Sequence, residues 1–284
     1  MEYTVLNNGV KIPMEGFGVF QVPDADECKQ AVRTALQTGY RLIDTAAAYF
    51  NEGAVGEAVR QSGVPRDEIF VTTKLWVQDF GYEKAKKAID TCLTNLNLDY
   101  ADMILLHQAF GDYYGAYRAL EEAYQAGKVR AIGVSNFYPA RLVDICMNFA
   151  TVPAVNQIEC HPFFQRNEDL RVAKEYGVHV EAWGPFAEGG HGIFTHPVLT
   201  AIGKKYGKTA AQVVLRWNVQ RGVVVIPKSV HKTRIEENFQ IWDFTLTEEE
   251  MQRISSLDLG YQGTAVKHFD PEFVKMCNTR KIHE

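Results

Sequence analysis

Eight short apolar runs, each rich in β-branched residues and followed by a helical stretch, constrain the fold of this chain more than any other feature. They are mostly continuous hydrophobic segments rather than alternations of apolar and polar residues, which is typical of parallel strands buried on both faces. We expect strands at 15–20, 41–45, 69–74, 102–107, 130–135, 154–159, 178–183 and 223–228.

Amphipathic stretches lie between these runs. The segment 117–125 places its apolar residues on one helical face, and Gly127 is placed to end that helix. Eight strand–helix pairs in about 250 residues predict an α/β fold, the (β/α)8 TIM barrel. The main alternative is a doubly wound sheet, which usually has a glycine-rich phosphate loop after its first strand. The Gly-Phe-Gly segment at 16–18 lacks the third glycine of such a loop.

Both ends of the chain carry local structural signals. Asn8-Gly9 between apolar residues is a strong hairpin signal, and a small hairpin there would plug the bottom of the barrel. Asp270-Pro271 begins what we interpret as a short capped helix in a C-terminal extension. Because no linker, low-complexity run or repeat divides the chain, we expect residues 1–284 to form one barrel domain.

Charge and composition argue against several classes of protein. The chain has 30 basic and 35 acidic residues and a net charge of −5, without a basic stripe that would bind nucleic acid. It has neither a membrane-length apolar run nor a secretory signal, so we expect a cytoplasmic protein without membrane contact. Five scattered cysteines argue against a disulfide framework, and Cys160-His161 lacks a second ligand pair for a metal. We expect a monomer, because no long exposed apolar stretch is evident.

Polar side chains stand where the predicted strands end. Asp44 ends the second strand, Lys74 the third and His107 the fourth. In a TIM barrel these strand ends meet on the face where active sites are built. Lys74 would then supply the cationic partner that a buried Asp44 needs, since an unpaired buried carboxylate costs several kcal/mol. The later strands reach Ser135, Asn136, Gln157, Trp183, Lys228 and Ser229 on the same face.

Each of these residues taken alone also has an ordinary structural interpretation. Asp44 is about equally well explained as a helix N-cap, and Lys74 as a solvated strand end. His107 alone suits a structural histidine, and Tyr49 suits an ordinary core residue. We favour the functional interpretation because four titratable types on one rim are less expected by chance than any one of them.

The combination of an aspartate, a tyrosine, a lysine and a histidine points to acid catalysis. A nearby ammonium lowers the pKa of a tyrosine, which is about 10 for the free side chain. Asp44, Lys74 and Tyr49 therefore predict a tuned acid, and His107 would orient the reacting oxygen. This set suits protonation of the alkoxide that forms from a carbonyl. Since none of these side chains can give a hydride, a nicotinamide must be bound.

Six segments carry a family resemblance: LIDTAAAY, FVTTKLW, ILLH, KVRAIGVSNF, NQIECHPF and VIPKSVHKTRIEENF. With these segments in this order, the chain resembles the aldo-keto reductases along nearly its whole length, most of all bacterial members related to diketogluconate and methylglyoxal reductases. The resemblance implies NADPH-dependent reduction of aldehydes and ketones to alcohols. It also places the catalytic tetrad at Asp44, Tyr49, Lys74 and His107, with Tyr49 as the general acid.

The resemblance further implies how the cofactor and substrate are bound. Ser135, Asn136 and Gln157 would hold the nicotinamide carboxamide, and Trp183 would stack against the ring. A phosphate grip at 228–234 would favour NADPH over NADH. The expected cofactor-binding residues are Gly18, Asp44, Ser135, Asn136, Gln157, Trp183, Gly184, Phe186, Lys228, Ser229, Arg234 and Asn238. The expected substrate-binding residues are Phe20, Tyr49, Trp76 and His107.

The sequence departs from the family pattern at two points. Gln108-Ala109-Phe110 follows the catalytic histidine where many members have Trp-Pro, so the substrate specificity of relatives does not carry over. Gly184 stands where many members have a serine that contacts the cofactor. The glycines of the segment 188–192 permit a hinge that would close over the pyrophosphate.

Two other functions stay open at this point. One is a cofactor-binding regulatory subunit that senses redox state with little turnover, which the intact tetrad disfavours. The other is a barrel isomerase acting on a sugar phosphate, which would need a phosphate grip but no residues for a nicotinamide.

Overall fold

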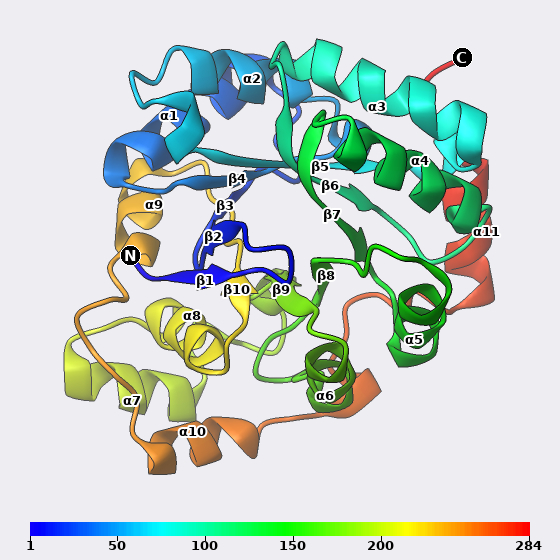
Figure 1. The fold of residues 1–284 in the computed structure, drawn as a ribbon. Coiled ribbons are helices and arrows are strands. Elements are labelled where there is room, and N and C mark those ends of the chain that lie inside the picture. Colours follow the sequence, from blue (N-terminus) through cyan, green and yellow to red (C-terminus); the bar gives the residue numbers. More distant parts are fainter.

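Eight parallel strands follow one another around a barrel in sequence order, and all eight predicted strands are confirmed (Figure 1). The two edges of the sheet meet where Glu15 bridges Val225, and the Gly16 amide donates to the Val225 carbonyl at 2.7 Å. The computed structural model describes all residues 1–284, and the (β/α)8 prediction is confirmed. The strands are β3 (Phe17–Gly18), β4 (Leu42–Asp44), β5 (Phe70–Leu75), β6 (Ala101–Leu106), β7 (Val129–Ser135), β8 (Val155–Glu159), β9 (His179–Trp183) and β10 (Val224–Val225).

Helices form the outer layer around the strands (Figure 1). The predicted helix at 117–125 lies within α4, and Gly127 follows its end with φ 75°. The helices are α1 (Ala25–Thr38), α2 (Glu52–Arg60), α3 (Tyr82–Leu96), α4 (Tyr113–Gln125), α5 (Pro139–Asn148), α6 (Asn167–Glu175), α7 (Pro197–Tyr206), α8 (Ala210–Gln220), α9 (Lys232–Phe239), α10 (Glu248–Ser255) and α11 (Pro271–Thr279). None of these helices combines the length and the apolar character needed to cross a membrane.

A hairpin of β1 (Tyr3–Val5) and β2 (Lys11–Pro13) forms at the Asn8-Gly9 turn, as the sequence predicted. Gly9 has φ 85°, a conformation that favours glycine. Ile12 is fully buried, and the Asn8 amide donates to the Arg130 carbonyl at 2.9 Å. Because Arg130 lies near the start of β7, the hairpin covers the N-terminal end of the barrel.

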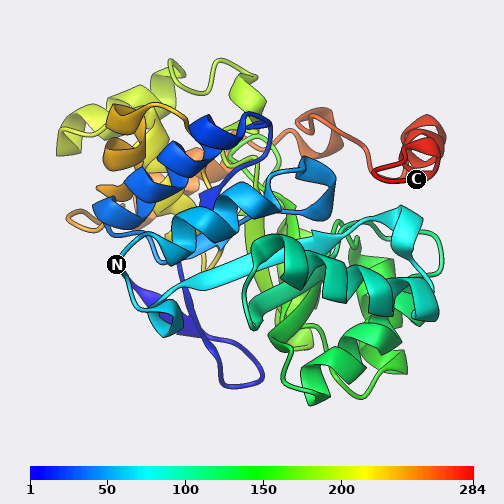
Figure 2. The ribbon, with the colours of Figure 1, turned by 90° about the horizontal axis from the view of Figure 1, so that it is seen from above.

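The C-terminal extension lies at the other end of the barrel from the hairpin (Figure 2). Its helix α11 begins as the sequence predicted, with the Asp270 carboxylate accepting a hydrogen bond from the Glu272 amide at 2.9 Å. The extension therefore shares its end of the molecule with the C-terminal ends of the strands, where the candidate site residues lie.

Candidate active site

The four residues of the predicted tetrad lie together at the C-terminal end of the barrel. Lys74 on β5 is fully buried and donates to Asp44 Oδ1 at 2.5 Å and to the Thr45 carbonyl at 2.9 Å. Tyr49 ends the short 3-10 helix η1 (Ala47–Tyr49), and its ring centroid lies 5.0 Å from Lys74 Nζ. The His107 ring, just after β6, lies 5.6 Å from the Tyr49 ring. Lys74 is therefore the cationic partner that the sequence predicted for the buried Asp44.

Burial controls the protonation of this group of residues. It raises the pKa of Tyr49, and the Lys74 ammonium opposes the rise. Lys74 therefore acts in the predicted direction, but it does not bring the pKa of Tyr49 below its ordinary value. Burial also lowers the pKa of His107 well below its usual range, and Lys74 adds to that effect. At neutral pH, Tyr49 thus holds its proton and His107 is uncharged.

Gln157 connects the tetrad to a second buried carboxyl group, Glu181, which sequence reasoning missed. The Gln157 amide nitrogen donates to Asp44 Oδ2 at 2.8 Å and to Glu181 Oε1 at 2.5 Å. Burial, together with the charge of Asp44, raises the pKa of Glu181 to about 8. Of these two carboxyl groups, only Asp44 forms an ion pair, and its partner is Lys74. Asp44 is therefore the group that stays ionised, and Glu181 is the one that holds a proton. The available sequence signal was its spacing: Glu181 precedes Trp183 by two positions and so faces the same side of β9.

The three residues predicted to hold a carboxamide form one hydrogen-bonded group beside the tetrad. The Ser135 hydroxyl donates to the Gln157 carbonyl at 2.9 Å, and the Asn136 amide donates to the His107 carbonyl at 3.0 Å. The Trp183 indole donates to Asn136 Oδ1 at 2.8 Å, which fixes the indole of Trp183. Amide groups and an aromatic face so arranged fit a nicotinamide ring with its carboxamide.

The residues predicted to grip a phosphate cluster after β10 and on α9. Lys228 and Arg234 are exposed and form no ion pair with an acidic side chain. Ser229 is nearly buried, and its hydroxyl accepts the His231 amide at 3.1 Å just before α9. Unpaired cations and a hydroxyl near the start of a helix fit a phosphate dianion. Asn238, four residues after Arg234 on the same helix, is buried.

Three further predicted cofactor residues lie on loops around this site. A Cβ on Gly18 would meet the Ile226 carbonyl at 3.2 Å, so the chain passes close to the segment before Lys228. Gly184 has φ 56°, a conformation that glycine adopts more readily than a residue with a side chain. Phe186 is half-buried and packs against Phe194, with ring centroids 5.5 Å apart.

Aromatic side chains surround the predicted reacting centre. The Phe20 ring lies 5.0 Å from the Tyr49 ring and is 44% exposed. The Trp76 ring lies 5.2 Å from the His107 ring, edge to face. The four residues predicted to bind substrate are thus brought together, each with its ring centroid 5.0 to 5.6 Å from that of another.

The C-terminal extension adds residues that sequence reasoning did not place at this site. His268 contacts Gln108 Oε1 through Nδ1 at 2.8 Å, and its ring lies 5.7 Å from the Trp183 ring. The Trp76 indole donates to the Arg280 carbonyl at 3.0 Å. These residues are separated from their partners by more than 80 positions, and no local signal in the sequence predicts such contacts.

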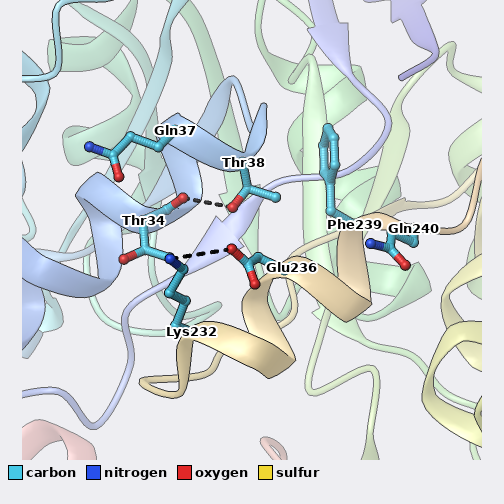
Figure 3. Close-up of a pocket in the computed structure, with 7 residues that line it drawn as sticks. All are labelled: Thr34, Gln37, Thr38, Lys232, Glu236, Phe239 and Gln240. Atoms are coloured by element: carbon cyan, nitrogen blue, oxygen red, sulfur yellow. Dashed lines mark hydrogen bonds and ion pairs between the residues drawn. The ribbon is translucent and has the colours of Figure 1, made fainter.

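Two surface cavities lie elsewhere and contain none of the tetrad. One is a polar cavity of about 400 Å³ between α1 and α9, where the Lys232–Glu236 ion pair already satisfies the charges (Figure 3). The other is a groove of about 750 Å³ between α2, α3 and the C-terminal residues 282–284.

Comparisons with known proteins agree with this geometry. A model of the aldo/keto reductase family matches residues 16–259. The chain is 46% identical over 255 residues to a 9,11-endoperoxide prostaglandin H2 reductase of Trypanosoma cruzi, covering 89% of this chain and 90% of that protein. It is 44% identical over 254 residues to a glyoxal reductase of Bacillus subtilis, covering 89% and 91%. An aldo-keto reductase from a Medee basin deep-sea metagenome library has a similar structure, with a TM-score of 0.89, 41% identity and coverage of 95% and 99%.

The chain belongs to the aldo/keto reductase family, and the predicted resemblance is confirmed. Its family and its reductase relatives make it an oxidoreductase of the carbonyl-reducing kind. Proteins of this family use nicotinamide cofactors, and the arrangement around Trp183 and Asn136 fits one.

Proposed function

We propose that this protein reduces aldehydes and ketones to alcohols with NADPH, and that Tyr49 is the general acid. The buried Lys74–Asp44 ion pair beside the Tyr49 ring is the observation that carries the proposal. No structural need explains an ammonium held at zero exposure beside a phenol, since a buried ion pair seldom adds stability. Unpaired Lys228 and Arg234 support NADPH over NADH, because the two coenzymes differ by a 2′-phosphate.

The roles of the chain's own residues follow from their positions. A bound nicotinamide supplies the hydride. The Tyr49 hydroxyl gives its proton to the carbonyl oxygen as negative charge develops there, and Lys74 stabilises the phenolate that remains. Uncharged His107 hydrogen-bonds the same oxygen and orients it. Trp183, held by Asn136, would stack against the nicotinamide, and Ser135 and Gln157 would hold its carboxamide. The monomeric state stays a prediction.

The experiment is NADPH oxidation in the presence of methylglyoxal, run on the wild type, Tyr49→Phe and Tyr114→Phe. The control Tyr114→Phe also removes a hydroxyl from a half-buried ring, but that hydroxyl donates to Asp144 on α5 and to no residue of the tetrad. We expect Tyr49→Phe to lower kcat by about 10²–10⁴ while the affinity for NADPH, measured by fluorescence quenching, stays unchanged.

Three outcomes would contradict the proposal in different ways. Equal loss in both variants would indicate a general structural effect of removing a hydroxyl. Retained activity in Tyr49→Phe would remove Tyr49 from its role as the acid. NADPH binding without turnover over a broad panel of carbonyl compounds would favour the redox-sensing alternative.

A further inference from the structure

The C-terminal extension brings one positive charge to the proposed substrate site. Arg280 directly follows α11, outside residues 16–259 that match the family model. Its Nη2 donates to the Ala48 carbonyl at 3.2 Å, on the 3-10 helix that carries Tyr49. Its guanidinium carbon lies 5.6 Å from the centre of the Trp76 ring. Arg280 thus contacts the segment that carries Tyr49 and the ring of Trp76.

Trp76 relates Arg280 to the reacting centre. The Trp76 ring contacts the His107 ring at 5.2 Å and the Arg280 guanidinium at 5.6 Å. The positive charge of Arg280 also reaches His107, since it is among the charges, after burial, that hold the pKa of His107 low. A substrate whose carbonyl oxygen meets His107 and Tyr49 therefore has the guanidinium within reach along the indole face.

The guanidinium has no anionic partner within the protein. Arg280 is exposed and makes no ion pair, although acidic residues are close in the same segment. The nearby Asp79 pairs instead with His283 at 2.7 Å. Of the other charged or titratable groups around the site, the Asp44 carboxylate is paired with the Lys74 ammonium, and His107 and His268 carry no negative charge. An anion at this position would meet a guanidinium that no carboxylate of the protein already pairs with, since Asp79 is paired with His283 and Asp44 with Lys74.

We propose that Arg280 binds an anionic group of the substrate, and that the enzyme prefers aldehydes and ketones that carry a carboxylate at a distance from the reacting carbonyl. A guanidinium suits a carboxylate because its planar donors match the two oxygens. The Ala48 carbonyl occupies one donor and leaves the others free. This inference rests on the proposed carbonyl reductase function and adds the substrate class to it.

The test compares two aldehydes of the same shape, 4-carboxybenzaldehyde and 4-methylbenzaldehyde, with NADPH. The variants are Arg280→Met and Arg280→Lys, and Lys281→Met is the control because it removes the adjacent exposed charge. Arg280→Met retains the backbone carbonyl that the Trp76 indole donates to, so the position of Trp76 is preserved. Thermal unfolding of each variant monitors the fold.

We expect the wild type to prefer the carboxylated aldehyde. Arg280→Met should lower its kcat/KM by about 10-fold or more, mainly through KM, and change the neutral aldehyde less than about twofold. Arg280→Lys should retain part of the preference, and Lys281→Met all of it. Raising the salt concentration should reduce the preference, since the guanidinium is exposed.

Equal use of both aldehydes by the wild type would overturn the inference and leave the carbonyl reductase function intact. An equal loss for both aldehydes in Arg280→Met would also overturn it, because Arg280 would then only position Trp76 or Tyr49 and would not bind the carboxylate. Failure of the wild type to reduce either aldehyde, or any other carbonyl compound, would overturn the proposed function and this inference with it.

Discussion

Removing the Lys74 ammonium should separate its effect on stability from its effect on catalysis. Lys74 is fully buried and Asp44 is 2% exposed, and their atoms lie 2.5 Å apart. In Lys74→Met, Asp44 would keep its hydrogen bond from Gln157 but would lose its only cation. Breaking a buried pair in this way costs about 3–5 kcal/mol of the free energy of unfolding. We expect a loss of that size in urea denaturation at pH 7.

The double variant Asp44→Asn/Lys74→Met is the matched control for this prediction. It removes both charges, and neutral replacement of a buried pair is often close to neutral in stability. We therefore expect the double variant to recover most of the stability that Lys74→Met loses. It should not recover activity, because Tyr49 still lacks the ammonium that stabilises its phenolate. The kcat of both variants should be lower than that of the wild type by about 10²–10⁴.

Two results would refute this reasoning. If the double variant were as unstable as Lys74→Met, the loss would come from packing and not from an unpaired carboxylate. If either variant kept kcat within about threefold of the wild type, Lys74 would not act on Tyr49. Measuring kcat from pH 8 to 11 gives a further check. Loss of Lys74 should move the Tyr49 ionisation to higher pH, because the ammonium opposes the effect of burial on the Tyr49 pKa.

Three further predictions concern the buried acid, the phosphate grip and the close approach of two helices. The folded-state pKa of Glu181, about 8, lies above its ordinary value of 4.5, so its contribution to stability is complete below about pH 4.5 and is lost as the pH rises through about 8. Glu181→Gln should therefore reduce the fall in Tm between pH 5 and 9. An unchanged fall would contradict the raised pKa of Glu181. Lys228→Met and Arg234→Met should each raise the KM for NADPH by about 10-fold and leave the KM for NADH nearly unchanged, whereas an equal effect on both coenzymes would exclude a contact with the 2′-phosphate. A Cβ on Gly56 would lie 1.8 Å from the Leu96 carbonyl oxygen, so Gly56→Ala should destabilise the fold by about 1–3 kcal/mol in urea denaturation. In Gly53→Ala, on the same helix, the nearest atom is 3.7 Å away, and this control should be neutral or slightly stabilising; equal losses in the two would refute the steric argument.

The positions of the tetrad could be predicted from the sequence because they depend on local pattern and topology. Continuous apolar runs indicated the strands, and the polar residues that end them were expected to meet because parallel strands in a barrel share one end. Asp44, Lys74 and His107 were placed in this way without any distance information. Tyr49 followed from its position shortly after the second strand, and the cofactor residues followed from the family segments.

Features that depend on how distant segments pack were decided only by the tertiary structure. Glu181 lies in an apolar run, and the sequence does not show that its carboxyl shares one amide with Asp44. The sequence also suggested that Lys74 lowers the pKa of Tyr49, whereas burial outweighs the ammonium. The physical reason is that desolvation depends on the atoms that surround a group, and those atoms come from many parts of the chain.

The C-terminal extension shows most clearly the difference between features that depend on local sequence and features that depend on long-range packing. Asp270-Pro271 was enough to predict the start of α11, because capping is a local interaction. The contact of Arg280 with Trp76 joins residues 204 positions apart, and it depends on where the folded barrel offers a surface for the extension. The sequence by itself therefore determined the barrel and predicted which polar side chains meet at its C-terminal end. Only the tertiary structure decided which charges surround them, because electrostatic interactions act through space and not along the chain.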